Sequence, residues 1–137
     1  MTDWLLYSLL SLGCFGLWGI FGKLSSFYIK AQDAIIYEAC GIALVALCLL
    51  IKYQFKIDTN LAGIVYSALM GISGIIGTLL LLLALKNGNT AVVTFITALY
   101  PSLVLIFSFL VFKEPISVQH AFGILFAILS ILLFTLN

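Results

Sequence analysis

The stretch LAGIVYSALMGISGIIGTLLLLLAL, residues 61–85, decides the fold class of this chain. It contains no charged residue, and a helix needs about 20 consecutive apolar residues to cross a bilayer. Asn60 precedes the stretch and Lys86 follows it, so polar residues bound it on both sides. The stretch therefore predicts a helix that spans a membrane.

Four further apolar blocks of similar length lie on either side of this stretch. Charged residues and turn formers separate them, so the expected helices run over about 4–22, 34–51, 61–85, 90–112 and 118–134. Strands of a membrane barrel would alternate over about 10 residues, and no such alternation dominates. Because the backbone in lipid must satisfy its own hydrogen bonds, helices are the remaining way for these blocks to cross the membrane. We expect an all-α membrane protein with five transmembrane helices in a single domain, residues 1–137.

The composition of the whole chain favours the same class. Hydrophobic residues make up 64% and charged residues 8% of the 137 positions, whereas a soluble domain carries about 25% charged residues. This composition excludes a soluble enzyme and a disordered tail. All six basic residues are Lys, and they are scattered, whereas a nucleic-acid binder needs a basic patch. We expect a multi-pass protein of the cell (inner) membrane, with the lipid bilayer and no nucleic acid as partner.

Signals for catalysis, metals or disulfides are weak in this sequence. Cys14, Cys40 and Cys48 lie inside the expected helices, without CxxC or Cys/His spacing. The chain has one His, and its acids are scattered, so neither a catalytic triad nor a metal cluster can be assembled. The acidic Asp3 and the lack of a cleavage site argue against a secretory signal. We expect no enzyme, no metal site and no cofactor.

The Lys residues divide evenly between the two sides of the membrane. Five spans place three on each side, namely Lys52, Lys56 and Lys113 with the N-terminus, and Lys23, Lys30 and Lys86 opposite. Cytoplasmic loops normally hold an excess of Lys and Arg, which sets the orientation. Two interpretations stay open. Either the chain inserts both ways and opposite copies pair as an antiparallel homodimer with inverted-repeat symmetry, or so small a count balances by chance.

Small residues recur in rows along the first and third expected helices. The rows are Gly13, Gly16, Gly19 and Gly22, and Ser67, Gly71, Gly74 and Gly77. Small residues let helices in lipid pack closely, but they also let helices bend as transport requires. The candidate flexing residues are Gly13, Gly16, Gly19, Gly71, Gly74 and Pro101.

Pro101 interrupts the hydrogen bonding of the fourth expected helix, because proline has no backbone N–H. We expect a kink there, with Thr94 and Thr97 on the side where a hydroxyl can bond to freed carbonyl groups. Tyr100 stands beside it and offers an aromatic face and a hydroxyl. Such a residue suits a binding cavity or a buried hydrogen bond.

Glu38 is the acid that lies inside an expected helix, about four residues from its start. Ionisable groups in spans are costly and are functional hypotheses by default. Because an apolar environment disfavours an ionised carboxyl group, Glu38 suits proton-coupled transport or cation binding. The alternative places Glu38 at the membrane interface, stabilised by the N-terminus of its helix.

Two more candidates stand near the end of the first expected helix. Lys23 either reaches the lipid headgroups or faces a central cavity. Trp18 lies deeper than the interfacial Trp4 and one turn before Lys23, so it could line the same cavity. The substrate-binding candidates are therefore Trp18, Lys23, Glu38 and Tyr100.

Three segments resemble one known family. WGIFGK, residues 18–23, resembles the start of the EamA repeat, which is the unit of the drug/metabolite transporter superfamily. Tyr100–Pro101 is similar to the aromatic-Pro or small-Pro step in its fourth helix. FKEPISVQ, residues 112–119, followed by Gly123, resembles the junction between its last two helices, with Lys113 in place of the usual Gly. Glu38 also departs from the repeat, which often has Arg near the start of the second helix.

This resemblance covers nearly the whole chain, and full-length members carry two such five-helix repeats in inverted topology. It implies a secondary transporter for a small metabolite or drug-like solute, with alternating access in a ten-helix assembly. The second half would be an antiparallel copy or a homologous five-helix partner. Two rivals stay open: a channel, for which no span shows a full polar stripe, and a non-transporting accessory membrane subunit.

Overall fold

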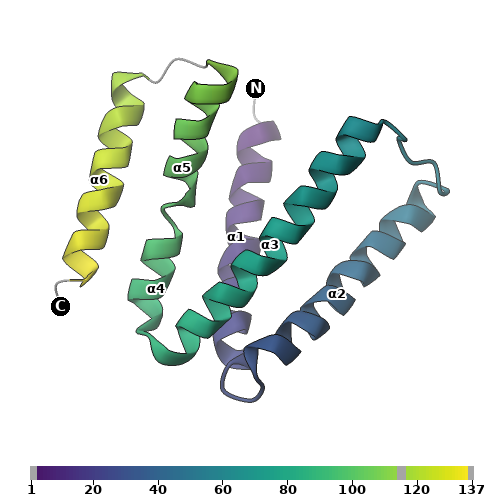
Figure 1. Ribbon diagram of the computed structural model, residues 1–137, viewed down its shortest axis with the longest axis horizontal. Coiled ribbons are helices and arrows are strands. Elements are labelled where there is room, and N and C mark those ends of the chain that lie inside the picture. The colour runs from purple at the N-terminus through teal and green to yellow at the C-terminus, as the bar shows by residue number, and fades with distance from the viewer. Residues whose placement is uncertain (1–2, 114–116, 136–137) are drawn as a thin grey trace. The chain divides into compact units, whose positions relative to one another are not determined.

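The computed structural model describes residues 3–113 and 117–135. These residues form six α-helices and a short π-helix, and none of them lies in a strand (Figure 1). The elements are α1 (Asp3–Ser25), α2 (Ala31–Lys52), α3 (Leu61–Asn87), α4 (Thr90–Thr97), α5 (Tyr100–Phe107), η1 (Ser108–Phe112) and α6 (Val118–Thr135). The all-α class expected from the sequence is confirmed.

Four helical segments are long and apolar enough to cross a membrane. They are α1, α2, α3 and the run Thr90–Phe112, and a shorter apolar helix covers Val118–Leu133. The observed helices extend past the expected ranges by at most three residues. The largest differences are that α1 ends at Ser25 and that α2 begins at Ala31. A multi-pass membrane protein follows from these lengths and compositions.

The chain divides into two compact units, one up to Lys86 and one from Asn87. The first unit contains α1, α2 and α3, and the second contains α4, α5, η1 and α6. In the first unit, Asn60 caps α3, because its side-chain Oδ1 accepts a hydrogen bond from the Gly63 N–H at 3.2 Å.

The buried residues of the first unit gather at one end of its three helices. Ala31, Ala34, Leu82 and Leu85 are the buried apolar residues there, with Leu85 only 2% exposed. The α1–α2 loop and the C-terminal end of α3 lie together at this end (Figure 1). The helices therefore pack against one another at one end. Most of their apolar surface elsewhere is exposed in the single chain.

The glycine rows behave differently at the two ends of α1. A Cβ atom added to Gly22 would lie 3.4 Å from Leu82 Cδ2, which is an ordinary van der Waals distance, so α1 contacts α3 there. Cβ atoms added at Gly13, Gly16, Gly19, Gly71, Gly74 or Gly77 would meet no atom within 4 Å. Both helices run unbroken through these glycines.

The second unit begins with an interrupted helix. α4 ends at Thr97 and α5 begins at Tyr100, with Pro101 in the first turn of α5. The expected kink is therefore a full interruption, and proline at this position fits because it needs no N–H partner in a first turn. The Thr94 hydroxyl donates to the Thr90 carbonyl at 2.7 Å, and the Thr97 hydroxyl donates to the carbonyls of Val93 and Thr94, both at 3.0 Å.

The same unit ends in a turn and a capped helix. η1 ends at Phe112, and the next residue, Lys113, adopts the left-handed conformation with φ 56° and ψ 28°. Ser117 caps α6, since its Oγ accepts from the His120 N–H at 3.2 Å. Glu114 and Pro115, which separate the fourth and fifth expected spans, lie outside the described residues. The left-handed backbone at Lys113 is the conformation that glycine adopts at no steric cost.

Candidate functional site

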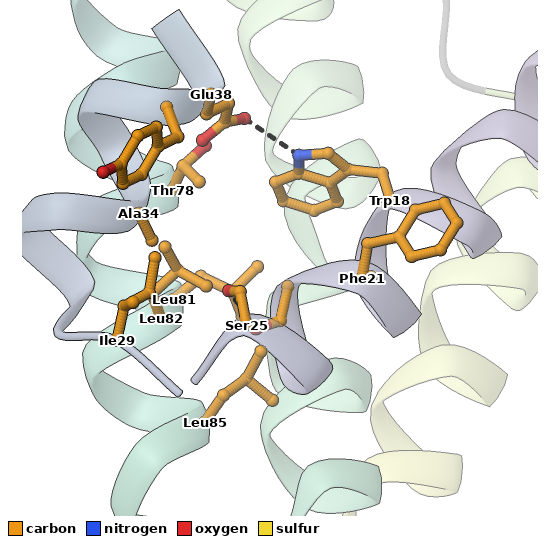
Figure 2. Close-up of a pocket in the computed structure, with 13 residues that line it drawn as sticks. Trp18, Phe21, Ser25, Ile29, Ala34, Glu38, Thr78, Leu81, Leu82 and Leu85 are labelled. Atoms are coloured by element: carbon orange, nitrogen blue, oxygen red, sulfur yellow. Dashed lines mark hydrogen bonds between the residues drawn. The ribbon is translucent and has the colours of Figure 1, made fainter. Parts of the chain in front are cut away.

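A cavity of about 240 Å³ lies among α1, α2 and α3, next to their packed end (Figure 2). Most of its lining is glycine, alanine, aliphatic or aromatic side chains. Its polar side chains, apart from the Trp18 indole, are Ser25, Tyr37, Glu38 and Thr78. All of these residues belong to the first unit, so the cavity is complete within it.

Trp18 and Glu38 meet in this cavity. The Trp18 indole Nε1–H donates to Glu38 Oε1 at 2.9 Å, across from α1 to α2 (Figure 2). Glu38 is half-buried and Trp18 is 38% exposed. This contact links α1 to α2 and limits the movement of both side chains.

The two residues meet because they lie at the same distance from the loop that joins their helices. Trp18 lies seven residues before the end of α1, and Glu38 lies seven residues after the start of α2. Each is therefore about 10 Å along its helix from the loop, at a rise of 1.5 Å per residue. Because α2 begins at Ala31, Glu38 lies two turns inside the helix, beyond the first turn where the helix dipole stabilises an anion.

Lys23 makes a structural contact at the packed end. Its Nζ donates to the Leu85 backbone carbonyl at 2.7 Å and lies 5.1 Å from the centroid of the Phe27 ring. Leu85 is in the last turn of α3, where carbonyl groups lack helical partners and a cation is favourable. Lys23 thus fastens the end of α1 to the end of α3. A substrate-binding role for Lys23 stays a prediction.

Two hydroxyl groups of the lining use their hydrogen within their own helix or turn. Ser25 Oγ donates to the Gly22 carbonyl at 2.9 Å, and Thr78 Oγ1 donates to the Gly74 carbonyl at 3.0 Å. Both residues are half-buried. Sequence reasoning missed Ser25, Tyr37 and Thr78, although Thr78 stands out as a hydroxyl in a long apolar run.

Comparison with known proteins fits this arrangement of helices. The sequence profile of the EamA-like transporter family matches residues 2–136. The chain belongs to the EamA-like transporter family. The match corresponds to a single EamA-type repeat of the drug/metabolite transporter superfamily, as the resemblance in the sequence indicated.

One curated relative is an uncharacterised protein of Methanocaldococcus jannaschii. It is 29% identical over 103 residues, which cover 75% of this chain and 74% of the relative. No solved structure gave a significant match. The EamA-like family therefore supports a membrane transporter of the drug/metabolite transporter superfamily.

The remaining candidate of this EamA-like chain lies in its second unit. Tyr100 is the first residue of α5 and is 61% exposed. Its role in substrate binding stays a prediction. Among the described residues, no group of three His, Cys, Asp or Glu side chains is placed to hold a metal ion.

The cavity itself is suited to binding a small solute. It contains one carboxyl group and no second ionisable group except the phenol of Tyr37. General acid–base catalysis on a bound substrate usually needs a matched acid and base. A single carboxyl group in an apolar cavity inside spanning helices instead suits a solute that binds and is released unchanged.

Proposed function

We propose that this EamA-like chain is a secondary transporter for a small metabolite or drug-like solute. It works by alternating access, with Glu38 as the group that exchanges protons. The observation that carries the proposal is the hydrogen bond from Trp18 to Glu38, 2.9 Å long, inside an apolar cavity among spanning helices. An ionisable side chain is costly at such a place and is expected to serve function.

The Trp18 contact gives a way to couple the proton to the solute. While Glu38 is ionised, it accepts the indole N–H strongly. Once Glu38 binds a proton, the carboxyl group is a weaker acceptor, and Trp18 is held less firmly. A change in the protonation of Glu38 therefore changes the wall of the cavity, which is the requirement for coupled transport.

A second five-helix chain completes the transporter in this proposal. Gly13, Gly16, Gly71 and Gly74 are exposed, and a Cβ atom added at any of them would meet no atom within 4 Å, so these positions leave room for close helix packing in lipid. The even division of Lys between the two sides supports an antiparallel copy as partner. A homologous five-helix chain would serve the same purpose in the cell membrane.

Proton coupling can be measured with purified protein in liposomes that enclose a pH-sensitive dye. Cationic, neutral and anionic small solutes are added outside, one at a time. At least one of them should drive a proton flux in the unmodified chain, and Glu38→Gln should abolish that flux. Asp33→Asn is the matched control, because it removes the same charge from the first turn of α2 and should keep the flux.

Two outcomes would contradict the proposal. Solute flux with unchanged pH dependence in Glu38→Gln would refute proton exchange at this residue. A chain that is helical and self-associated by mass measurement, yet moves no solute and no proton, would indicate an accessory membrane subunit.

A further inference from the structure

The cavity offers more hydrogen-bond acceptors than free hydrogen-bond donors. Its strongest donor, the Trp18 indole N–H, already bonds to Glu38 Oε1. The hydroxyl hydrogens of Ser25 and Thr78 are directed to the carbonyls of Gly22 and Gly74. Because a hydroxyl has one hydrogen and two lone pairs, both oxygens keep accepting capacity. The Glu38 carboxylate, with two oxygens and about four acceptor positions, adds more.

Positive charge is missing from the lining. None of the 13 lining residues is Lys, Arg or His. The nearest basic residue along α1 is Lys23, and its ammonium group bonds to the Leu85 carbonyl at the packed end. Tyr37 contributes a phenol, which can donate or accept but carries no positive charge. An anion in this cavity would therefore lie beside a carboxylate without a countercharge.

We propose that the cavity binds a small organic ammonium ion, a protonated primary or secondary amine with an apolar or aromatic body. This inference rests on the proposed transport function and names its substrate class. The N–H donors of the ion bond to Glu38 and to the hydroxyl oxygens, while its body lies against the apolar lining. Desolvation of the Glu38 carboxylate is compensated by the opposite charge, which an uncharged or anionic solute does not offer.

The geometry also limits the size of the ion. The cavity volume of about 240 Å³ is below the roughly 300–1,000 Å³ of pockets for drug-sized ligands. A body with one ring is therefore the appropriate size for the cavity of a single chain.

Three probes of nearly equal shape separate charge from size. They are 2-phenylethylammonium, 2-phenylethanol and 3-phenylpropionate. The chain has two Trp residues, so Trp4→Phe leaves Trp18 as the single indole, inside the cavity. Its fluorescence, excited where the probes do not absorb, reports binding to the protein in lipid nanodiscs.

The ammonium probe should change Trp18 emission in a saturable manner. We expect it to bind about tenfold to a hundredfold more tightly than the alcohol, as for one hydrogen bond to a charged group. The carboxylate should bind more weakly than the alcohol. Glu38→Gln should remove the advantage of the ammonium probe and leave the response to the alcohol, which shows that the cavity is intact. Asp33→Asn, with the same loss of charge outside the lining, should keep the advantage.

Several outcomes would overturn the inference. They are tighter binding of the carboxylate than of the ammonium ion, an ammonium advantage that persists in Glu38→Gln, an equal response to sodium chloride, and no response to any probe. None of these outcomes decides the proton-flux measurement, which tests the transport function separately. Proton flux driven by an anionic solute would keep the transport function while refuting this substrate class.

Discussion

Replacing Lys23 by Met tests how the first three helices are held together. The substitution keeps the length of the side chain and removes the ammonium group that bonds to the Leu85 carbonyl at 2.7 Å. It also removes the cation from the Phe27 ring, 5.1 Å away. We expect the first unit to lose stability at its packed end, where Leu85 is 2% exposed and water cannot readily replace the lost donor.

The magnitude follows from the surroundings of the bond. A hydrogen bond to a charged group contributes about 1.5–3 kcal/mol. Lys23 is half-buried, so the lower part of this range applies, and Lys23→Met should lower the free energy of unfolding by about 1.5–2 kcal/mol. The unfolded fraction would then rise roughly 10- to 30-fold.

The assay is reversible unfolding in mixed micelles of increasing denaturing detergent, followed by circular dichroism. Lys30→Met is the matched control, because Lys30 is exposed and precedes α2 without a capping side-chain bond. Its effect should stay within about 0.5 kcal/mol. Equal losses of unfolding free energy in both variants would show that the bond from Lys23 to Leu85 does not stabilise the packed end. Unchanged stability of Lys23→Met together with weaker solute binding would instead support the cavity role that the sequence suggested.

Three further substitutions test local features of the fold by the same unfolding measurement. Lys113→Gly should raise the free energy of unfolding by about 1 kcal/mol, because glycine adopts the left-handed conformation of this residue without steric cost; a loss would contradict the backbone assignment. Asn89→Ala should cost about 1 kcal/mol, since its side chain accepts from the N–H groups of Ala91 and Val92 and caps α4, and no change would argue against the cap. Gly74→Ala should raise the free energy of unfolding of the monomeric chain by about 0.5–1 kcal/mol, because the added Cβ meets open space in the chain; a loss of monomer stability would contradict this.

The helices were predictable from the sequence because the bilayer fixes their length and excludes charges from their interior. The stretch 61–85 sufficed for α3, and the polar segments on either side set the other ends within three residues. Pro101 likewise predicted a kink in the fourth expected helix, where the structure has an interruption between α4 and α5. These signals are local and need no knowledge of the partner helix.

The contacts between helices were not predictable in the same way. Trp18 and Glu38 were both candidates, and the expected helix ends at residues 22 and 34 place each of them four residues from the loop. The sequence does not show which way each side chain points from its helix, and this direction decides whether the two form a hydrogen bond.

The partner of Lys23 could not be predicted from the sequence either. Its ammonium group bonds to the backbone carbonyl of Leu85, 62 residues away. Every residue has such a carbonyl group, so the residue type does not identify the partner. The hydroxyls of Ser25 and Thr78 become candidates for binding only because both residues line the cavity that α1, α2 and α3 form together. Pairing with a second chain and dual insertion stay predictions from the division of the Lys residues.

Proton exchange at Glu38 can be measured through the emission of Trp18 as the pH is lowered, in a Trp4→Phe chain held in lipid nanodiscs. We expect a change in emission when Glu38 binds a proton, because the carboxyl group then holds the indole N–H less strongly. The change should be absent in Glu38→Gln and present in Asp33→Asn. An emission that does not respond to pH, or that responds equally in Glu38→Gln, would contradict the claim that Trp18 and Glu38 form the proton-exchanging centre of this transporter.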